Sequence, residues 1–190
     1  SRHCQQYYRS PCPISEPIAF IQWLTTLIEA EGITHLFPMT EITSQLLLFN
    51  RNKLGHCSLP FADITTVMQL ANKAKLTELA EKLDIPFPST QHLNDSLSLN
   101  TLNNINYPCV LKPALSHIWQ QTHWLSTNVK IIRSQAELTA AATLPDFADH
   151  PFMLQEFIPG HGAGIFAIYN QGKAVAFFAH QRLREKPPQG

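Results

Sequence analysis

The sequence predicts an α/β protein whose second half has α+β character. In the first 50 residues, apolar side chains recur mostly at the spacing of three and four that places them on one face of a helix. From residue 107 onward, short apolar runs bounded by proline, glycine or polar residues indicate strands instead. The chain has 190 residues and is 44% hydrophobic, so it is long enough to bury a core as one large domain or two small ones.

Charge and composition argue against several classes of protein. Fourteen basic and fourteen acidic residues cancel, which leaves no broad positive field for a nucleic-acid partner. No apolar run reaches the roughly 18 residues of a membrane-spanning helix, and the N-terminus has no apolar signal-peptide core. We therefore expect a cytoplasmic protein that binds neither nucleic acid nor membrane. Because the sequence starts without methionine and stops in loop-like KPPQG, we also expect it to be cut from a longer chain.

Helices and a strand alternate in the first 50 residues. Residues 15–32 and 40–49 have helical spacing, and the apolar run 33–38 between them ends at a proline, as a short strand would. A helix, a strand and a helix joined by tight turns indicate part of a parallel α/β layer, whose remaining strands lie partly upstream of residue 1. The residues expected to begin or end these helices are Ser15, Pro17, Gly32 and Thr40.

Two more helices follow before the strand-rich half. Asp63 is a suitable cap for a helix over 64–70, and the leucines of 72–88 recur at helical spacing until Ile85 precedes a proline. Residues 91–106 are rich in asparagine, serine and threonine, which indicates a loop, or a short helix followed by a loop.

The second half is expected to be built mainly from strands. One helix, over 135–144, interrupts them, and the Gln-Gly pair at 171–172 is expected to turn the last two strands into a hairpin. The predicted strands are 107–113, 128–134, 152–158, 164–170 and 173–180.

Four features of this framework carry side chains suited to chemistry. Lys73 opens a helix, Lys112 ends the buried run CVLKPA, LQEFIPG covers residues 154–160, and RLRE covers 182–185. A buried ammonium is costly unless an anion meets it, so we ask what Lys112 binds. Each feature also has a structural interpretation. Lysines at the ends of helices and strands often extend to solvent, LQEFI fits an edge strand, and the two arginines fit an exposed basic pair beside Glu185.

The order and spacing of these features resemble the ATP-grasp superfamily, above all its carboxylate–amine ligase branch, which is carbamoyl-phosphate-synthase-like. NKAKLTELAEKLDIPFPST resembles the family's entry helix, and the segment that begins at LQEFIPGHGAG resembles its nucleotide hinge and the following hairpin. SRHCQQYYRSPCP and the helix after it resemble the late part of the pre-ATP-grasp domain. The resemblance implies three parts: a partial Rossmann-like pre-ATP-grasp domain at 1–70, the central, nucleotide-lid subdomain at 71–158, and the truncated start of the C-terminal subdomain at 159–190.

Carried over by position, the resemblance implies an ATP site. Lys73 and Lys112 would contact the phosphates, where two compact cations on rigid elements neutralise charge without rearranging. The extended hinge would offer backbone groups to adenine, and one of its first two side chains would reach the amino group or the ribose, among apolar walls. Either Arg182 or Arg184 would act in catalysis by holding the γ-phosphate or an acyl phosphate bidentately. The hinge residues are Gln155, Glu156, Phe157 and Ile158.

The sequence departs from the family pattern in two places. Many relatives fold a glycine-rich loop over the phosphates, whereas residues 114–128 contain no glycine, so side chains would have to donate instead. ATP-grasp chemistry also uses Mg²⁺, which requires carboxylate ligands, and only Glu185 follows Glu156. We therefore expect no metal ligand within this chain and place the Mg²⁺ site beyond residue 190. The candidate donors in the glycine-free segment are Ser116, His117, Gln121 and Thr122.

Two functions are consistent with this sequence. The first is an ATP-dependent ligase that joins a small carboxylate to an amine through an acyl phosphate and releases ADP and phosphate, with ATP and Mg²⁺ as cofactors. This chain would supply mainly the ATP-binding half and would be inactive alone. The second is a non-catalytic nucleotide-binding or interaction module, motivated by the missing glycine loop and the missing acidic residues. A downstream acidic cluster of the Glu…Glu-x-Asn type would favour the ligase, and its absence would favour the module.

Overall fold

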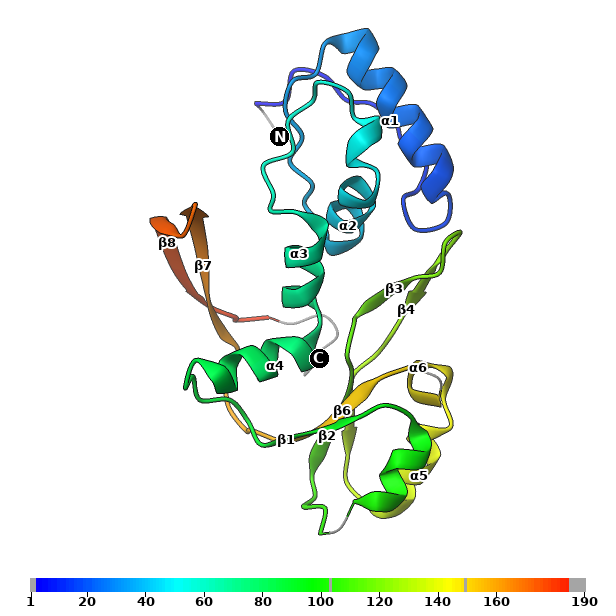
Figure 1. The fold of residues 1–190 in the computed structure, drawn as a ribbon, viewed down its shortest axis with the longest axis vertical. Helices are drawn as coiled ribbons and strands as arrows, with labels where there is room; N and C mark the ends of the chain where they lie inside the picture. The colour runs from blue at the N-terminus through cyan, green and yellow to red at the C-terminus, as the bar shows by residue number, and fades with distance from the viewer. Residues whose placement is uncertain (1–2, 103, 149, 185–190) are drawn as a thin grey trace.

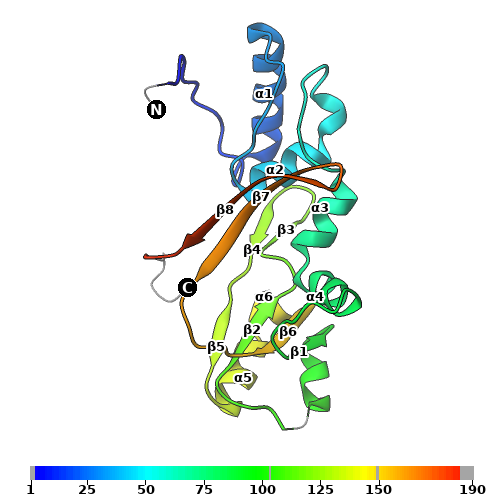
Figure 2. The ribbon, with the colours of Figure 1, turned by 90° about the vertical axis from the view of Figure 1, so that its left-hand side faces the viewer.

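The structure, a computed structural model, describes residues 3–102, 104–148 and 150–184. A helical part lies at one end of the molecule, and a sheet flanked by helices lies at the other end (Figure 1). A two-stranded hairpin near the end of the described chain stands to the left of these parts (Figure 1), so in the turned view it lies in front of them (Figure 2). This arrangement confirms the predicted mixture of helices and strands.

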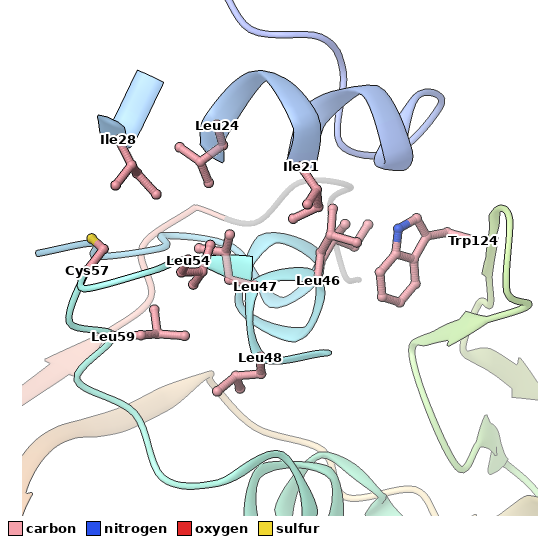
Figure 3. Packing of buried hydrophobic residues seen from close by; sticks show 11 residues of the cluster. Ile21, Leu24, Ile28, Leu46, Leu47, Leu48, Leu54, Cys57, Leu59 and Trp124 are labelled. Atoms are coloured by element: carbon pink, nitrogen blue, oxygen red, sulfur yellow. The ribbon is translucent and has the colours of Figure 1, made fainter. Parts of the chain in front are cut away.

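The helical part buries an apolar cluster of its own. Its elements are α1 (Pro17–Glu31), α2 (Glu41–Phe49), the 3₁₀ helix η1 (Arg51–Lys53) and α3 (Ile64–Ala71). Ile21, Leu24 and Ile28 of α1 point into the same space as leucines of α2 (Figure 3). Trp124 enters this cluster from a distant part of the chain, and its side chain points toward Leu46 (Figure 3).

Of the residues predicted to begin or end the first three helices, only Ser15 is wrong. Thr40 and Asp63 cap α2 and α3, each by accepting a backbone N–H three residues ahead, and Gly32 ends α1 with a left-handed φ of 61°. Ser15 was the wrong cap for α1, because the N-cap is Glu16, whose side chain makes no capping bond. The proline at the first helical position holds the residue before it out of the helical region, so the helix begins one residue later than Ser15 would require.

The strand predicted over 33–38 is wrong in extent. Only His35 pairs, in an isolated parallel bridge with Ser58. Two backbone bonds hold this bridge: Leu36 N–H donates to Ser58 O at 2.9 Å, and Ser58 N–H donates to Thr34 O at 2.7 Å. A strand needs a ladder of pairs, and the described residues supply only this one bridge.

The central sheet has four strands in the order β1-β6-β2-β5, and every neighbouring pair is antiparallel. Its core face packs on α5 and α6, where Leu111, Leu138 and Phe147 are fully buried. The strands are β1 (Thr90–Leu93), β2 (Cys109–Pro113), β5 (Lys130–Ile132) and β6 (Phe152–Glu156). The helices beside the sheet are α4 (Lys73–Lys82), the 3₁₀ helix η2 (Ser96–Thr101), α5 (Gln135–Ala142) and α6 (Pro145–Ala148).

Two hairpins complete the fold. The pair β3 (His117–Trp119) and β4 (Trp124–Ser126) lies in the glycine-free segment and extends toward α1 and α2 (Figure 1). The pair β7 (Ala163–Asn170) and β8 (Lys173–Gln181) confirms the predicted hairpin, and its turn residues Gln171 and Gly172 have φ values of 49° and 79°. No helix of the described residues is long and apolar enough to cross a bilayer.

Candidate functional site

The face of the central sheet opposite its core carries two rows of side chains. Because paired residues of antiparallel strands share a face, the register between strands determines these rows. Lys112 lies in the row next to that of Gln155, so the two are diagonal neighbours on β2 and β6. The rows are Thr90–Gln155–Val110 and His92–Met153–Lys112.

Lys112 is half-buried on this face and has an amide as its partner. Its Nζ donates to Oε1 of Gln155 at 2.6 Å. Burial lowers the pKa of Lys112 below the ordinary value of 10.5. No carboxylate of the described residues forms an ion pair with it, so its charge is solvated only in part and is not neutralised. An anionic ligand would lower the cost of this burial.

Lys73 reaches the same region from α4. The side chain of Asn72 caps the helix, and the backbone N–H of Lys73 donates to Ala114 O at 2.9 Å, which ties the start of α4 to the end of β2. Its Nζ donates to Oγ of Ser116 at 2.9 Å. Burial is the main cause of a lowered pKa for Lys73, opposed by Glu41, and the charge of Lys112 lowers the pKa further. The two predicted phosphate-binding lysines are therefore close enough to repel each other.

Among the described residues, Glu41 is the only carboxylate with an electrostatic effect on the pKa of either lysine, and it raises that of Lys73. It is the first residue of α2 and accepts a hydrogen bond from Gln45 Nε2 at 3.0 Å. His117 Nε2 of the β3–β4 hairpin lies 3.9 Å from the other carboxylate oxygen. Glu41 therefore connects helix α2 with the β3–β4 hairpin and with Lys73.

The hinge residues lie where β6 ends. The predicted strand 152–158 is two residues too long, because β6 stops at Glu156. Gln155 is buried, whereas Glu156, Phe157 and Ile158 are exposed. The backbone N–H of Glu156 donates to Ser89 O at 2.9 Å. Contact of these residues with adenine stays a prediction.

The two arginines follow β8 and are not part of it. The strand ends at Gln181, so strand alternation does not orient Arg182 and Arg184 to one face. Arg182 lies against Gly162, where an added Cβ would come within 2.3 Å of its Nε. Because residue 162 is glycine, the guanidinium of Arg182 can lie against its backbone without a clash. Arg184 is exposed. Their catalytic role stays a prediction.

The described residues do not fit a Mg²⁺ site. No group of three or more histidine, cysteine, aspartate or glutamate side chains in the described part of the chain could hold a metal ion. Glu41, the carboxylate near Lys73, already contacts Gln45 and His117. We therefore derive no chemical step through a metal from these residues.

The cavity beside the helical part of the molecule does not contain the two candidate lysines. A cavity of about 720 Å³ lies between α1, α2 and the tip of the β3–β4 hairpin, with Ile21, Phe49 and Trp119 in its walls. Neither lysine lines it. We locate the candidate site by charge instead, because two half-buried ammonium groups favour an anionic ligand, whereas a mixed surface hollow indicates no ligand class.

Sequence reasoning missed Thr90 and the pairing of Lys112 with Gln155. Thr90 lies next to a segment that was predicted as a loop or short helix, and no local signal marks it as a strand residue. Lys112 and Gln155 are 43 residues apart, so no local sequence pattern relates them. Only the antiparallel pairing of β2 with β6 brings them together.

The described fold thus combines an antiparallel four-stranded sheet, flanking helices, the β3–β4 hairpin and two lysines that lie near each other. Comparison with known structures confirms that the chain carries part of an ATP-grasp fold. An L-amino acid ligase from Bacillus licheniformis superposes with a TM-score of 0.58 at 18% identity, over 86% of this chain and 35% of that chain. The ADP complex of N5-carboxyaminoimidazole ribonucleotide synthetase gives 0.58 at 16% identity, over 87% and 41%.

One curated protein is similar in sequence. The carbamoyl phosphate synthase large chain of Pyrococcus furiosus is 30% identical over 118 residues, which cover 58% of this chain and 10% of the synthase. The chain thus spans about a tenth of that relative and under half of the two superposed structures. No protein-family model matches the chain.

The lowered pKa values of the two lysines predict how nucleotide binding depends on pH. The predicted contacts with ATP phosphates require protonated amines, so ATP affinity should fall as pH rises through the lysine pKa values, which lie below 10.5 because of burial. Stability should change in the opposite sense: the unfolded lysines hold protons more tightly, so their contribution rises with pH between the folded and unfolded pKa values. Titration calorimetry with ATP at increasing pH tests the first effect. Lys112→Met should remove part of the pH dependence, and an identical profile would contradict it.

Proposed function

We propose that this chain is the ATP-binding half of an ATP-dependent carboxylate–amine ligase of the ATP-grasp type. The whole protein would join a small carboxylate to an amine through an acyl phosphate and release ADP and phosphate. The observation that carries this proposal is the pair of half-buried lysines, Lys73 and Lys112, and no carboxylate in the described part of the chain forms an ion pair with Lys112. The ATP-grasp fold supports it, as does the sequence similarity to a carbamoyl phosphate synthase.

The residues of this chain would bind and orient the nucleotide. In this proposal, the ammonium groups of Lys73 and Lys112 neutralise phosphate charge from rigid elements, which lowers the cost of charge that develops on phosphoryl transfer. The end of β6 offers backbone groups to the base. Ser116 now accepts from Lys73, so a phosphate oxygen would take its place on that ammonium.

The experiment is an assay of ADP release. A protein that contains this chain together with any downstream acidic cluster is incubated with ATP, Mg²⁺ and a panel of amino acids and small carboxylates. We expect ADP and phosphate to appear only when both a carboxylate and an amine are present, and the 190-residue chain alone to bind ATP without turnover. Turnover by the 190-residue chain, or unchanged turnover after Lys112→Ala, would contradict the proposal.

A non-catalytic nucleotide-binding module is the second candidate. It is favoured by the β3–β4 hairpin, whose Trp124 is buried in the helical cluster while Ser116 at its base accepts from Lys73. In this second candidate, the hairpin stays packed on the helical part and does not close over a nucleotide. Nucleotide binding without ADP release by the longer protein, across the whole substrate panel, would favour the module over the ligase.

A further inference from the structure

We propose that Gln155 and Thr90 act as positioning residues, which hold the ammonium of Lys112 toward the anion site and leave its charge available. The inference rests on the proposed nucleotide-binding function and gives Gln155 a role other than contact with adenine. Three hydrogen bonds carry it, on three neighbouring strands. Lys112 Nζ donates to Gln155 Oε1 at 2.6 Å, Gln155 Nε2 donates to Thr90 Oγ1 at 2.8 Å, and Thr90 Oγ1 donates to Pro88 O at 2.6 Å.

The direction of every bond in this chain is determined by chemistry. The carbonyl of Pro88 can only accept, so the single hydroxyl hydrogen of Thr90 is committed to it. The hydroxyl therefore presents a lone pair to Gln155, which must turn its amide nitrogen toward Thr90. Its oxygen then faces Lys112, which can only donate. The contacts with Thr90 and with Lys112 therefore require the same orientation of the Gln155 amide.

Burial makes this orientation rigid. Gln155 is 8% exposed, and a buried amide that lost either partner would pay the desolvation cost of an unsatisfied polar group. It lies on β6 between β1 and β2, so backbone ladders on both sides fix its Cα. The oxygen of Gln155 is thus a fixed acceptor for the ammonium of a long, otherwise flexible side chain.

Because the amide of Gln155 is neutral, Lys112 keeps its positive charge available for an anionic ligand. A carboxylate at the same distance would neutralise Lys112, and the site would lose attraction for an anion. The amide instead directs one hydrogen of the ammonium and leaves two for a ligand. Among the described residues, Lys73 on α4 is the charged group that interacts electrostatically with Lys112, and Glu41 on α2 interacts with Lys73.

Binding measurements with ATP, GTP and inorganic tripolyphosphate test the positioning role. Gln155→Met keeps the length of the side chain without its amide, and Thr90→Val keeps the shape without the hydroxyl. We expect each variant to weaken all three ligands by the same factor, about tenfold, with an unchanged ratio of ATP to GTP affinity. Thr90→Ser, which restores the hydroxyl, should restore affinity. In a Lys112→Met background, Gln155→Met should have no further effect.

Specific outcomes would overturn the inference. If Gln155→Met lowers ATP affinity but spares GTP and tripolyphosphate, Gln155 contacts the base instead of positioning Lys112. An equal loss in the Lys112→Met background, or no loss in any variant, would also refute the role. Thermal unfolding of each variant confirms that the fold is retained.

A measurement without nucleotide separates this inference from the proposed function. In the free protein, Gln155→Glu should raise the pKa of Lys112, followed by NMR of the lysine ammonium, because the carboxylate would stabilise the cation. If Gln155→Glu raises the pKa of Lys112 while the wild-type protein binds none of the three ligands, the nucleotide function is refuted and the contact is kept. An unchanged pKa would refute the contact itself.

Discussion

Replacing Lys112 with alanine should weaken ATP binding by about a hundredfold, the loss expected from one charge-assisted contact to a phosphate in a partly buried site. The ammonium is half-buried, its direction is set by Gln155, and no described carboxylate neutralises it. Its positive charge can therefore attract an anionic ligand without first breaking an ion pair. Titration calorimetry with MgATP measures the change directly.

Two controls make this result specific. Lys75→Ala removes an exposed lysine from α4, two residues from Lys73, and should leave the affinity within about twofold, as expected for a solvated charge. Lys112→Met keeps the apolar stem and should be as weak as the alanine variant. Both Lys112 variants leave Oε1 of the buried Gln155 without this partner, so thermal unfolding of each variant is measured to confirm that the fold is retained. ATP affinity within twofold of the wild type in Lys112→Ala would remove this lysine from the site.

Replacing Phe147 with alanine should lower the free energy of unfolding by about 3–5 kcal/mol, the usual cost of emptying a fully buried phenylalanine site. Phe147 has no exposed surface, and its ring packs edge-on against Phe152 with centroids 5.7 Å apart. Phe152 lies in β6, the strand that carries Gln155. The same core therefore supports the strand on which the candidate site depends.

Denaturant unfolding measures this loss. A typical domain is stable by only about 5–15 kcal/mol, so the variant should unfold at a clearly lower denaturant concentration. Phe37→Ala is the matched control, because that ring is 67% exposed and its removal should change stability by no more than about 0.5 kcal/mol. Equal stability of the Phe147 variant and the control would show that α6 does not close the core of the central sheet.

Local chemistry made much of the fold predictable. Thr40, Asp63 and Gly32 mark helix ends through bonds to backbone groups a few residues away, so sequence alone reveals them. The apolar runs of β2 and β6 were visible because both strands are buried on one face and partly on the other. The two lysines were found by their positions at the ends of regular elements.

Short or long-range features were not predictable. The strands β3 and β4 have three residues each, too few to show alternation, and the turn between them contains no glycine although Gln121 takes a φ of 65°. The contact of Trp124 with the helical cluster joins parts of the chain that local patterns cannot relate. The helix predicted within 72–88, with its end near Asp84, is confirmed as α4, which ends at Lys82. Its Leu76 and Leu79 are nevertheless 45% and 41% exposed, because spacing predicts a face and not its partner.

The central claim is that Lys73 and Lys112 bind the phosphates of ATP. A structure of the protein with a bound, non-hydrolysable ATP analogue tests it most directly. The claim predicts both Nζ atoms within hydrogen-bond distance of phosphate oxygens, Lys112 still bonded to Gln155, and the bond from Lys73 to Ser116 replaced by a phosphate. A nucleotide bound away from these two lysines would contradict the claim.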